Sequence, residues 1–204
     1  MSDGYAAVAA TDEVRAAQAR LGSRSALSRL TRPRGGSPND EPRDPLTEFE
    51  REFVGARDGF YLSSVSSTGW PYVQFRGGPP GFVRSPDEHT LAWADFRGNR
   101  QYISTGNIAG DERVALFFMD YPNRLRLKVF GRARTVDARD DRDLAAELAV
   151  PGYRAVVEQA VVVTVVAFDW NCPQHITPRY SEPELEALLA PMRTSGQEAA
   201  TGAG

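Results

Sequence analysis

The chain has 204 residues and a formal net charge of -3, and 41% of its residues are hydrophobic. This is enough sequence for one domain with a real core, while the mildly acidic balance argues against a nucleic-acid binder. No apolar run reaches membrane-spanning length, residues 1–5 lack the features of a signal peptide, and the single cysteine, Cys172, excludes an internal disulfide. We therefore expect a cytoplasmic protein that binds neither nucleic acid nor a membrane.

Residues 1–45 are predicted to form an N-terminal arm and linker. Residues 12–30 are rich in alanine and arginine and favour a helix, but their apolar stripe is weak. Residues 31–45 are rich in Pro, Gly, Asp and Arg, a composition typical of linkers. We favour a partly ordered extension, and the alternative is an arm that embraces a partner subunit.

The folded domain is expected over residues 46–193. Thr47 can cap a helix that runs to about residue 56. The residues expected on the buried side of this helix are Leu46, Phe49, Phe53 and Val54. Two strand-like runs follow at residues 60–65 and 71–76, and the turn between them predicts a β-hairpin.

The most informative stretch begins after a strand-like run at residues 90–93. It reads Ala94-Asp95-Phe96-Arg97-Gly98-Asn99-Arg100-Gln101, and we interpret it as a turn that opens a helix ending near Asn107. Gly98 would let the backbone come close to a ligand, and the first amides of the helix would have no intrahelical partner. With Arg97 and Arg100 beside them, these amides predict an anion seat, most naturally for a phosphate. The alternative is a tight connection with solvated arginines.

The remaining elements are expected in a simple order. They are a central strand at 113–119, a half-buried strand at 125–136, a helix at 140–148, a buried strand at 160–168, a helix at 182–192 capped by Ser181, and a disordered tail at 194–204. The second of these strands has a basic outer face of Arg124, Arg126 and Lys128, and Gly131 marks a bulge. About six strands with short flanking helices predict a mainly β (α+β) fold, an antiparallel barrel with helical additions.

Other motifs are less specific. Residues 77–81, Gly-Gly-Pro-Pro-Gly, match neither a Walker loop nor a dinucleotide fingerprint, and they form either a sheet-breaking turn or a close approach to a flat ligand. The sheet is expected to resume briefly at 82–83 before a turn at 86–88. His89 and His175 are the only histidines, and no cysteine or carboxylate cluster supports them, so we expect no metal site. Trp170 follows a buried strand, where it either plugs the barrel end or covers a flat ring.

At these residues the chain resembles the pyridoxamine 5'-phosphate oxidase-like, FMN-binding split-barrel family, in particular its bacterial flavin-nucleotide-binding branch. The resemblance runs from about residue 46 to residue 179. It is carried, in this order, by Gly69-Trp70-Pro71-Tyr72-Val73-Gln74, Gly98-Asn99-Arg100-Gln101, Asp111-Glu112-Arg113-Val114-Ala115-Leu116 and Trp170. It implies a six-stranded split β-barrel that forms a homodimer and holds FMN in two clefts at the subunit interface.

The resemblance also implies a set of cofactor-binding residues. The phosphate would lie against Asn99, Arg100 and Gln101, with Gln101 standing where a lysine is common in the family. Gln74 stands where the oxidases often place an arginine, and two other arginines, Arg76 and Arg126, lie where they could compensate. The isoalloxazine would run beside Phe75 and Arg76, the ribityl chain or ring edge beside Ala94 and Asp95, and the cleft would be closed, often from the other subunit, by Trp170, Gln174 and Arg179.

The function implied is an FMN-dependent oxidoreductase that transfers hydride or electrons between the flavin and a small organic substrate. The alternatives are a flavin-binding or carrier protein without turnover, or the same fold with F420 or haem in place of FMN. Because flavin chemistry takes place on the ring, no acid–base residue is required. His175 is the one candidate proton donor near the site.

Overall fold

The computed structural model describes residues 2–25, 44–170 and 173–190. The chain divides into two compact units, the first formed by residues 1–119 and 126–171 and the second by residues 120–125 and 172–204. The barrel and the candidate site belong to the first unit. Among the described residues, no helix combines the length and apolar character that crossing a bilayer requires.

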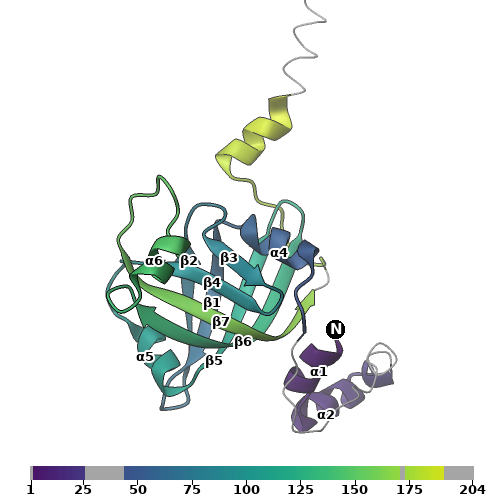
Figure 1. Ribbon diagram of the computed structural model, residues 1–204. Coiled ribbons are helices and arrows are strands. Elements are labelled where there is room, and N and C mark those ends of the chain that lie inside the picture. The colour runs from purple at the N-terminus through teal and green to yellow at the C-terminus, as the bar shows by residue number, and fades with distance from the viewer. Residues whose placement is uncertain (1, 26–43, 171–172, 191–204) are drawn as a thin grey trace, which may run out of the picture. The chain divides into compact units, whose positions relative to one another are not determined.

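One seven-stranded antiparallel sheet forms the first unit, in the order β2-β1-β5-β6-β7-β4-β3 (Figure 1). Its strands are β1 (Gly59–Val65), β2 (Pro71–Gly77), β3 (Val83–Asp87), β4 (Thr90–Phe96), β5 (Arg113–Asp120), β6 (Leu125–Asp137) and β7 (Val157–Trp170). The predicted antiparallel, mainly β fold is confirmed. The sheet has one strand more than the six expected, because β3 runs as far as Asp87, where a turn was expected.

Side chains from distant strands hold the two ends of the sheet together. The ring of Phe60 on β1 packs edge-on against Trp93 on β4 at 5.0 Å, and it stacks on Phe118 of β5 at 4.9 Å. These rings are almost fully buried. Because β1 lies near one edge of the sheet and β4 near the other, this aromatic cluster closes the barrel through its interior.

A bulge on β6 confirms the expectation for Gly131. The register between β6 and β7 shifts between Phe130 and Gly131. A Cβ atom at Gly131 would collide with the side chain of Val163 and come within 2.9 Å of the backbone oxygen of Thr164. The strand therefore needs a glycine for space, not for an unusual backbone angle.

Five labelled helices accompany the sheet: α1 (Asp3–Ala9), α2 (Asp12–Arg20), α4 (Glu48–Gly55), α5 (Ile103–Gly110) and α6 (Arg142–Leu148). A further helix covers residues 182–190 of the second unit. Helix α2 ends at Arg20, well before the expected residue 30. Residues 26–30 of that expected helix and most of the linker lie outside the described residues, as does the tail at 194–204. On α4, Phe53 and Val54 are buried as expected, but Phe49 is 57% exposed and contacts Trp170 at the surface.

Helix α1 was not predicted, and it packs on the barrel. Its Tyr5 is buried against Val166 and Ala167 of β7 and stacks on Phe130 of β6 at 4.7 Å. Ser2 caps the helix by accepting from the Tyr5 amide, and the Ser2 hydroxyl donates to the backbone oxygen of Phe168 at 2.7 Å. Residues 2–9 therefore belong to the barrel unit, while the domain boundary at residue 46 and the embrace of a partner stay predictions.

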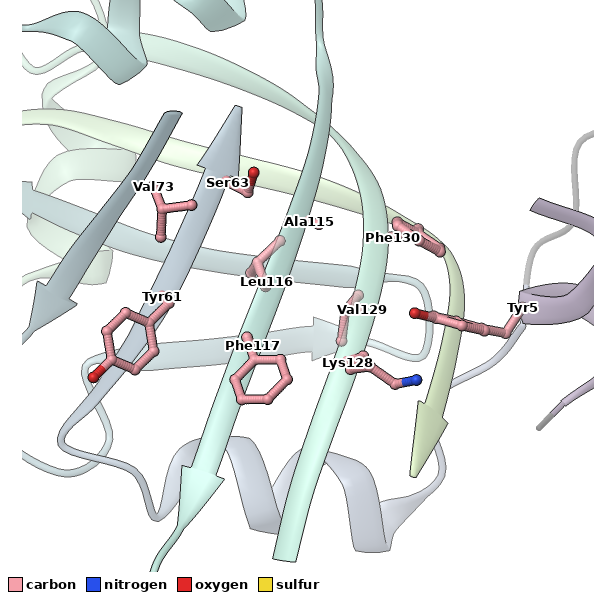
Figure 2. Close-up of a pocket in the computed structure, with 10 residues that line it drawn as sticks. All are labelled: Tyr5, Tyr61, Ser63, Val73, Ala115, Leu116, Phe117, Lys128, Val129 and Phe130. Atoms are coloured by element: carbon pink, nitrogen blue, oxygen red, sulfur yellow. The ribbon is translucent and has the colours of Figure 1, made fainter. Parts of the chain in front are cut away.

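Next to Tyr5 of α1, strands β1, β2, β5 and β6 form an open apolar groove of about 500 Å³. Figure 2 shows its lining: Tyr5, Tyr61, Ser63, Val73, Ala115, Leu116, Phe117, Lys128, Val129 and Phe130. Two of these side chains are strongly exposed for their type, Val73 by 59% and Tyr61 by 39%. The groove shares no lining residue with the two cavities of the candidate site described next.

Candidate functional site

The segment between β4 and α5 starts and ends at residues other than those predicted. Strand β4 continues through Ala94 and Asp95 to Phe96, where a turn was expected, and α5 begins only at Ile103. Gly98 is not among the residues with left-handed backbone angles, and a Cβ atom there would meet nothing within 4 Å. The free amides of the helix therefore lie several residues later than the sequence suggested, and Gly98 does not make the bend.

The bend is made by two residues that carry large side chains. Arg100 has a φ of 61° and Tyr102, the residue before α5, has a φ of 52°. The left-handed region costs an L-residue roughly 1–2 kcal/mol, and such strain concentrates at functional sites. Asn99 stabilises the loop, since its side-chain oxygen accepts from the Gln101 amide at 3.1 Å. No side chain caps the amino end of α5, so this end keeps free N–H groups for a ligand.

Three hydrogen bonds fix α5 against the barrel. Ser104 donates to the side-chain oxygen of Gln74 on β2 at 3.2 Å, and Asn107 donates to Ser64 on β1 at 3.1 Å. On the other side, Gln159 of β7 donates to Thr105 at 2.8 Å. The amino end of α5 is thus held between two strands that come from opposite parts of the sheet order.

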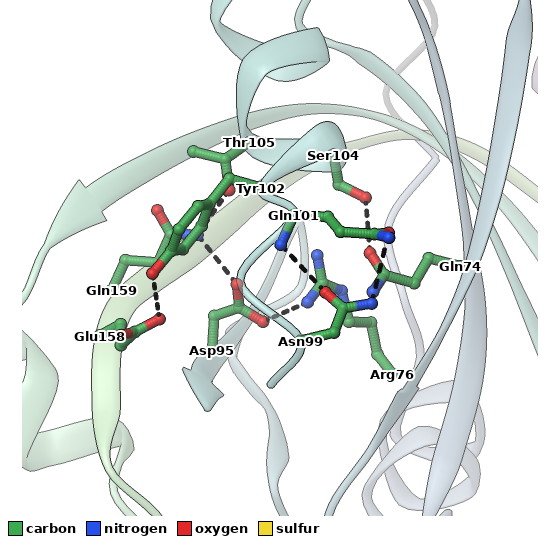
Figure 3. Close-up of polar contacts among 10 residues, drawn as sticks. All are labelled: Gln74, Arg76, Asp95, Asn99, Gln101, Tyr102, Ser104, Thr105, Glu158 and Gln159. Atoms are coloured by element: carbon green, nitrogen blue, oxygen red, sulfur yellow. Dashed lines mark hydrogen bonds and ion pairs between the residues drawn. The ribbon is translucent and has the colours of Figure 1, made fainter. Parts of the chain in front are cut away.

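A half-buried ion pair lies beside this helix (Figure 3). Arg76 of β2 donates through Nη1 to Asp95 of β4 at 2.7 Å, and the second oxygen of Asp95 accepts from Gln159 at 2.9 Å. The side chains of Arg76 and Asp95 are 17% and 11% exposed. Both residues line a cavity of about 260 Å³, the ring cavity, together with Gln74, Phe82, Trp93, Phe96 and Tyr153.

A second network surrounds the strained loop. Arg97 donates to Glu158 at 2.7 Å, Tyr102 donates to the other oxygen of Glu158 at 3.1 Å, and Arg100 approaches the Tyr102 hydroxyl at 3.4 Å. The hydrogen bond from Arg97 holds the pKa of Glu158 below its usual value, so this carboxylate is ionised at neutral pH. These side chains line a cavity of about 500 Å³, the polar cavity.

The charges of the site nearly cancel, except at one residue. Arg76 is balanced by Asp95, and Arg97 is balanced by Glu158. Among the described residues, no carboxylate forms an ion pair with Arg100, although Glu158 lies near enough to act on its charge. Arg100 is therefore the cation that this loop offers to an external anion.

The structure brings together eight of the predicted site residues. Gln74, Arg76, Asp95, Asn99, Arg100 and Gln101 surround the loop and the two cavities, as Figure 3 shows for five of them. Phe75 and Ala94 line the ring cavity as well. The side chain of Phe75, however, packs on Gly59 and Tyr61 on the face of β2 away from Arg76, and Ala94 belongs to the apolar cluster with Leu148.

The other predicted residues lie elsewhere. Trp170 is at the opposite end of β7 from Gln159, where its indole donates to Glu50 at 2.8 Å. Arg126 lies near the start of β6, beside Leu127, which pairs with Trp170. Gln174, His175 and Arg179 belong to the second unit, in which Arg179 lies over the ring of Tyr121 at 5.1 Å. Neither Trp170 nor Arg126 lines the ring cavity, and the roles of all five residues stay predictions.

Sequence reasoning missed several residues of the site. They are Trp93, Tyr102, Ser104, Thr105, Glu158 and Gln159. Glu158 and Gln159 precede the residue at which the β-branched run was expected to start, so they were read as outside the strand. Strand alternation could have placed Trp93 on the same face as Asp95. The described residues contain no group of three or more His, Cys, Asp or Glu side chains placed to hold a metal ion.

Comparisons with known proteins agree with this fold. The family model described as Pyridoxamine 5'-phosphate oxidase matches residues 46–168. HupZ from Group A Streptococcus is 16% identical, with 66% of this chain and 100% of HupZ covered and a TM-score of 0.50. The chain is also similar to a protein related to general stress protein 26 from Clostridium acetobutylicum, at 14% identity and a TM-score of 0.44, with 66% of this chain and 92% of that protein covered. It is similar to an FMN-binding protein from Syntrophomonas wolfei as well, at 12% identity and a TM-score of 0.42, with 79% of this chain and 96% of that protein covered. No curated protein sequence matches the chain.

Proposed function

This chain belongs to the pyridoxamine 5'-phosphate oxidase family, and we propose that it is an FMN-dependent oxidoreductase acting on a small organic substrate. The observation that carries the proposal is the amino end of α5, which has no side-chain cap and lies next to Arg100. A phosphate monoester suits this position, because free helix amides and a guanidinium with no ion-pair partner among the described residues both favour a dianion. The left-handed backbone angles of Arg100 and Tyr102 support the proposal as well, because strained backbone of this kind is found most often at ligand-binding sites.

The remaining residues fit the other parts of FMN. The phosphate would be held by Asn99, Arg100 and Gln101 with the first amides of α5, and the ring would enter the ring cavity beside Arg76 and Asp95. When bound, FMN supplies hydride or electron transfer on its ring. The protein supplies the position of the ring and the hydrogen-bond donors around it.

A direct test is to purify the protein and titrate it with FMN. We expect a yellow protein whose flavin is released on denaturation and which is reduced by NADH or NADPH. Arg100→Ala should weaken FMN binding about tenfold or more, the loss expected for one charge-assisted hydrogen bond of about 1.5–3 kcal/mol. Arg139→Ala is the matched control, because Arg139 lines the same polar cavity but is already paired with Asp137. A protein that remains colourless with added FMN would overturn the proposal.

We also propose that the protein is a homodimer that forms through the apolar groove of Figure 2. The support is the exposed apolar surface of β1 and β2, in which Val73 is 59% exposed. A charge at its centre, Val73→Glu, should convert a dimer into a monomer in sedimentation experiments at micromolar concentration. Val14→Glu on α2, a helix that buries none of its residues, should leave the assembly unchanged. A wild-type monomer would contradict this proposal.

A further inference from the structure

We infer that Arg76 and Trp93 form a donor pair that recognises neutral acceptor atoms on the ring of the ligand, and that Arg76 does not bind the phosphate. This inference rests on the proposed function, and it chooses between the two roles that the sequence left open for Arg76. It also assigns a role to Trp93, which no sequence motif singled out.

The charge of Arg76 is already balanced inside the protein. Its Nη1 atom lies 2.7 Å from Asp95, and both side chains are largely shielded from solvent. Asp95 is in turn held by Gln159, which is fixed by Thr105 at the first turn of α5. A guanidinium locked to a carboxylate has little net charge to offer a phosphate dianion. Arg76 therefore does not replace the lysine or arginine that the phosphate seat lacks.

Arg76 still has one donor that is not used. Its Nε is buried and makes no hydrogen bond to any described residue, and the same is true of the indole Nε1 of Trp93. Both residues line the ring cavity. Buried donors are nearly always paired in native proteins, because an unpaired one loses its hydration without compensation. Two unpaired N–H groups around one cavity indicate a ligand that brings acceptors to it.

The walls of the ring cavity define the chemical class of this ligand. Phe82, Phe96 and Tyr153 contribute aromatic side chains, and Phe96 and Tyr153 pack edge-on at 5.0 Å. Aromatic walls suit a planar ring, and uncharged N–H donors or a charge-balanced guanidinium suit carbonyl oxygens and ring nitrogens. The cavity thus fits a flat heterocycle with acceptors along its edge, whereas an anion would meet Asp95 in the same cavity.

The test compares FMN with riboflavin, which has the same ring and no phosphate. The Arg76→Lys variant keeps the positive charge opposite Asp95 but loses the Nε donor, and it is checked for wild-type thermal stability. We expect it to weaken FMN and riboflavin by the same factor, about tenfold, so that the ratio of the two affinities is unchanged. Arg100→Ala is the matched control, which should weaken FMN but leave riboflavin binding unchanged.

The possible outcomes separate this inference from the proposed function. If wild-type protein binds neither FMN nor riboflavin, the proposed function fails. If wild-type protein binds both and Arg76→Lys weakens FMN alone, Arg76 serves the phosphate and the inference fails while the function stands. If Arg76→Lys changes neither affinity, a bound water satisfies the donor and the inference fails as well. Should Arg76→Lys lower the thermal stability, Asp95→Asn provides the second measurement, since loss of the anchor should again weaken both ligands equally.

Discussion

The contact between Trp170 and Glu50 allows a quantitative test of how the barrel end is held. The indole Nε1 donates to Glu50 Oε1 at 2.8 Å, and the indole ring packs edge-on against Phe53 at 4.6 Å. Glu50 is only 6% exposed. Trp170→Phe keeps an aromatic ring next to Phe53 and removes the donor, so a buried carboxylate loses one of its hydrogen bonds.

A hydrogen bond to a charged group contributes about 1.5–3 kcal/mol to the free energy of unfolding. For a domain of this size, that loss lowers the melting temperature by about 3–12 °C. Burial raises the pKa of Glu50, but hydrogen bonds from the Thr47 side chain, from Trp170 and from backbone amides outweigh burial and hold the pKa below 4.5. Because the folded-state pKa is lowered, the stabilisation is complete above about pH 4.5 and is lost as the pH falls through the folded-state value.

The assay is urea unfolding of cofactor-free protein at pH 7 and at about pH 3. The loss caused by Trp170→Phe should be full at pH 7 and smaller at the acidic pH, because the stabilisation of ionised Glu50 is lost as the pH falls through its lowered folded-state pKa. Trp70→Phe is the matched control, because Trp70 is 76% exposed and should contribute little. A Trp170→Phe protein within about 0.5 kcal/mol of wild type at pH 7 would refute the reasoning.

Three further pairs of variants test other features. Gly131→Ala should lower the free energy of unfolding by about 1–3 kcal/mol because its Cβ collides with the neighbouring strand, whereas Gly98→Ala should change it by less than about 0.5 kcal/mol; equal stabilities in denaturant titration would contradict this. Tyr5→Ala should weaken the docking of α1 by about 3 kcal/mol and speed proteolysis of the N-terminal segment, and unchanged cleavage relative to Val14→Ala would count against it. Tyr102→Gly should be about 1 kcal/mol more stable than Tyr102→Ala, because glycine relieves the left-handed angle; the opposite order would show that the loop is not strained.

The strands could be predicted from sequence where one face of each is buried. On β6, Leu127 and Val129 are buried and alternate with half-buried Arg126 and Lys128, and this period of two is visible in the sequence. The hairpin of β1 and β2 could be predicted for the same reason, together with its Gly69 turn, whose φ of 82° is left-handed. Local patterns succeed here because burial alternates with each residue along the chain.

The end of β4 could not be predicted in this way. Aspartate is common in turns and rare in strands, so the sequence favours a turn at Asp95. A buried carboxylate within a strand also departs from the usual alternation of apolar and polar residues. It is buried because Arg76, nineteen residues earlier on a different strand, lies 2.7 Å from it. The sequence contains both residues but not their pairing, which depends on the curvature of the whole sheet.

The bend before α5 is a second feature that local sequence patterns did not place correctly. The sequence placed the start of the helix after Gly98 because glycine is the residue that usually makes a sharp bend, yet the bend is at Arg100 and Tyr102. Tertiary contacts stabilise this costly geometry, since Tyr102 donates to Glu158 and the first turn of α5 is tied to Gln159. Gln159 also holds Asp95, and through it Arg76, so the first turn of α5 and the ring cavity are joined by one chain of hydrogen bonds. A substitution that breaks this chain at Asp95 should therefore also alter the first turn of α5.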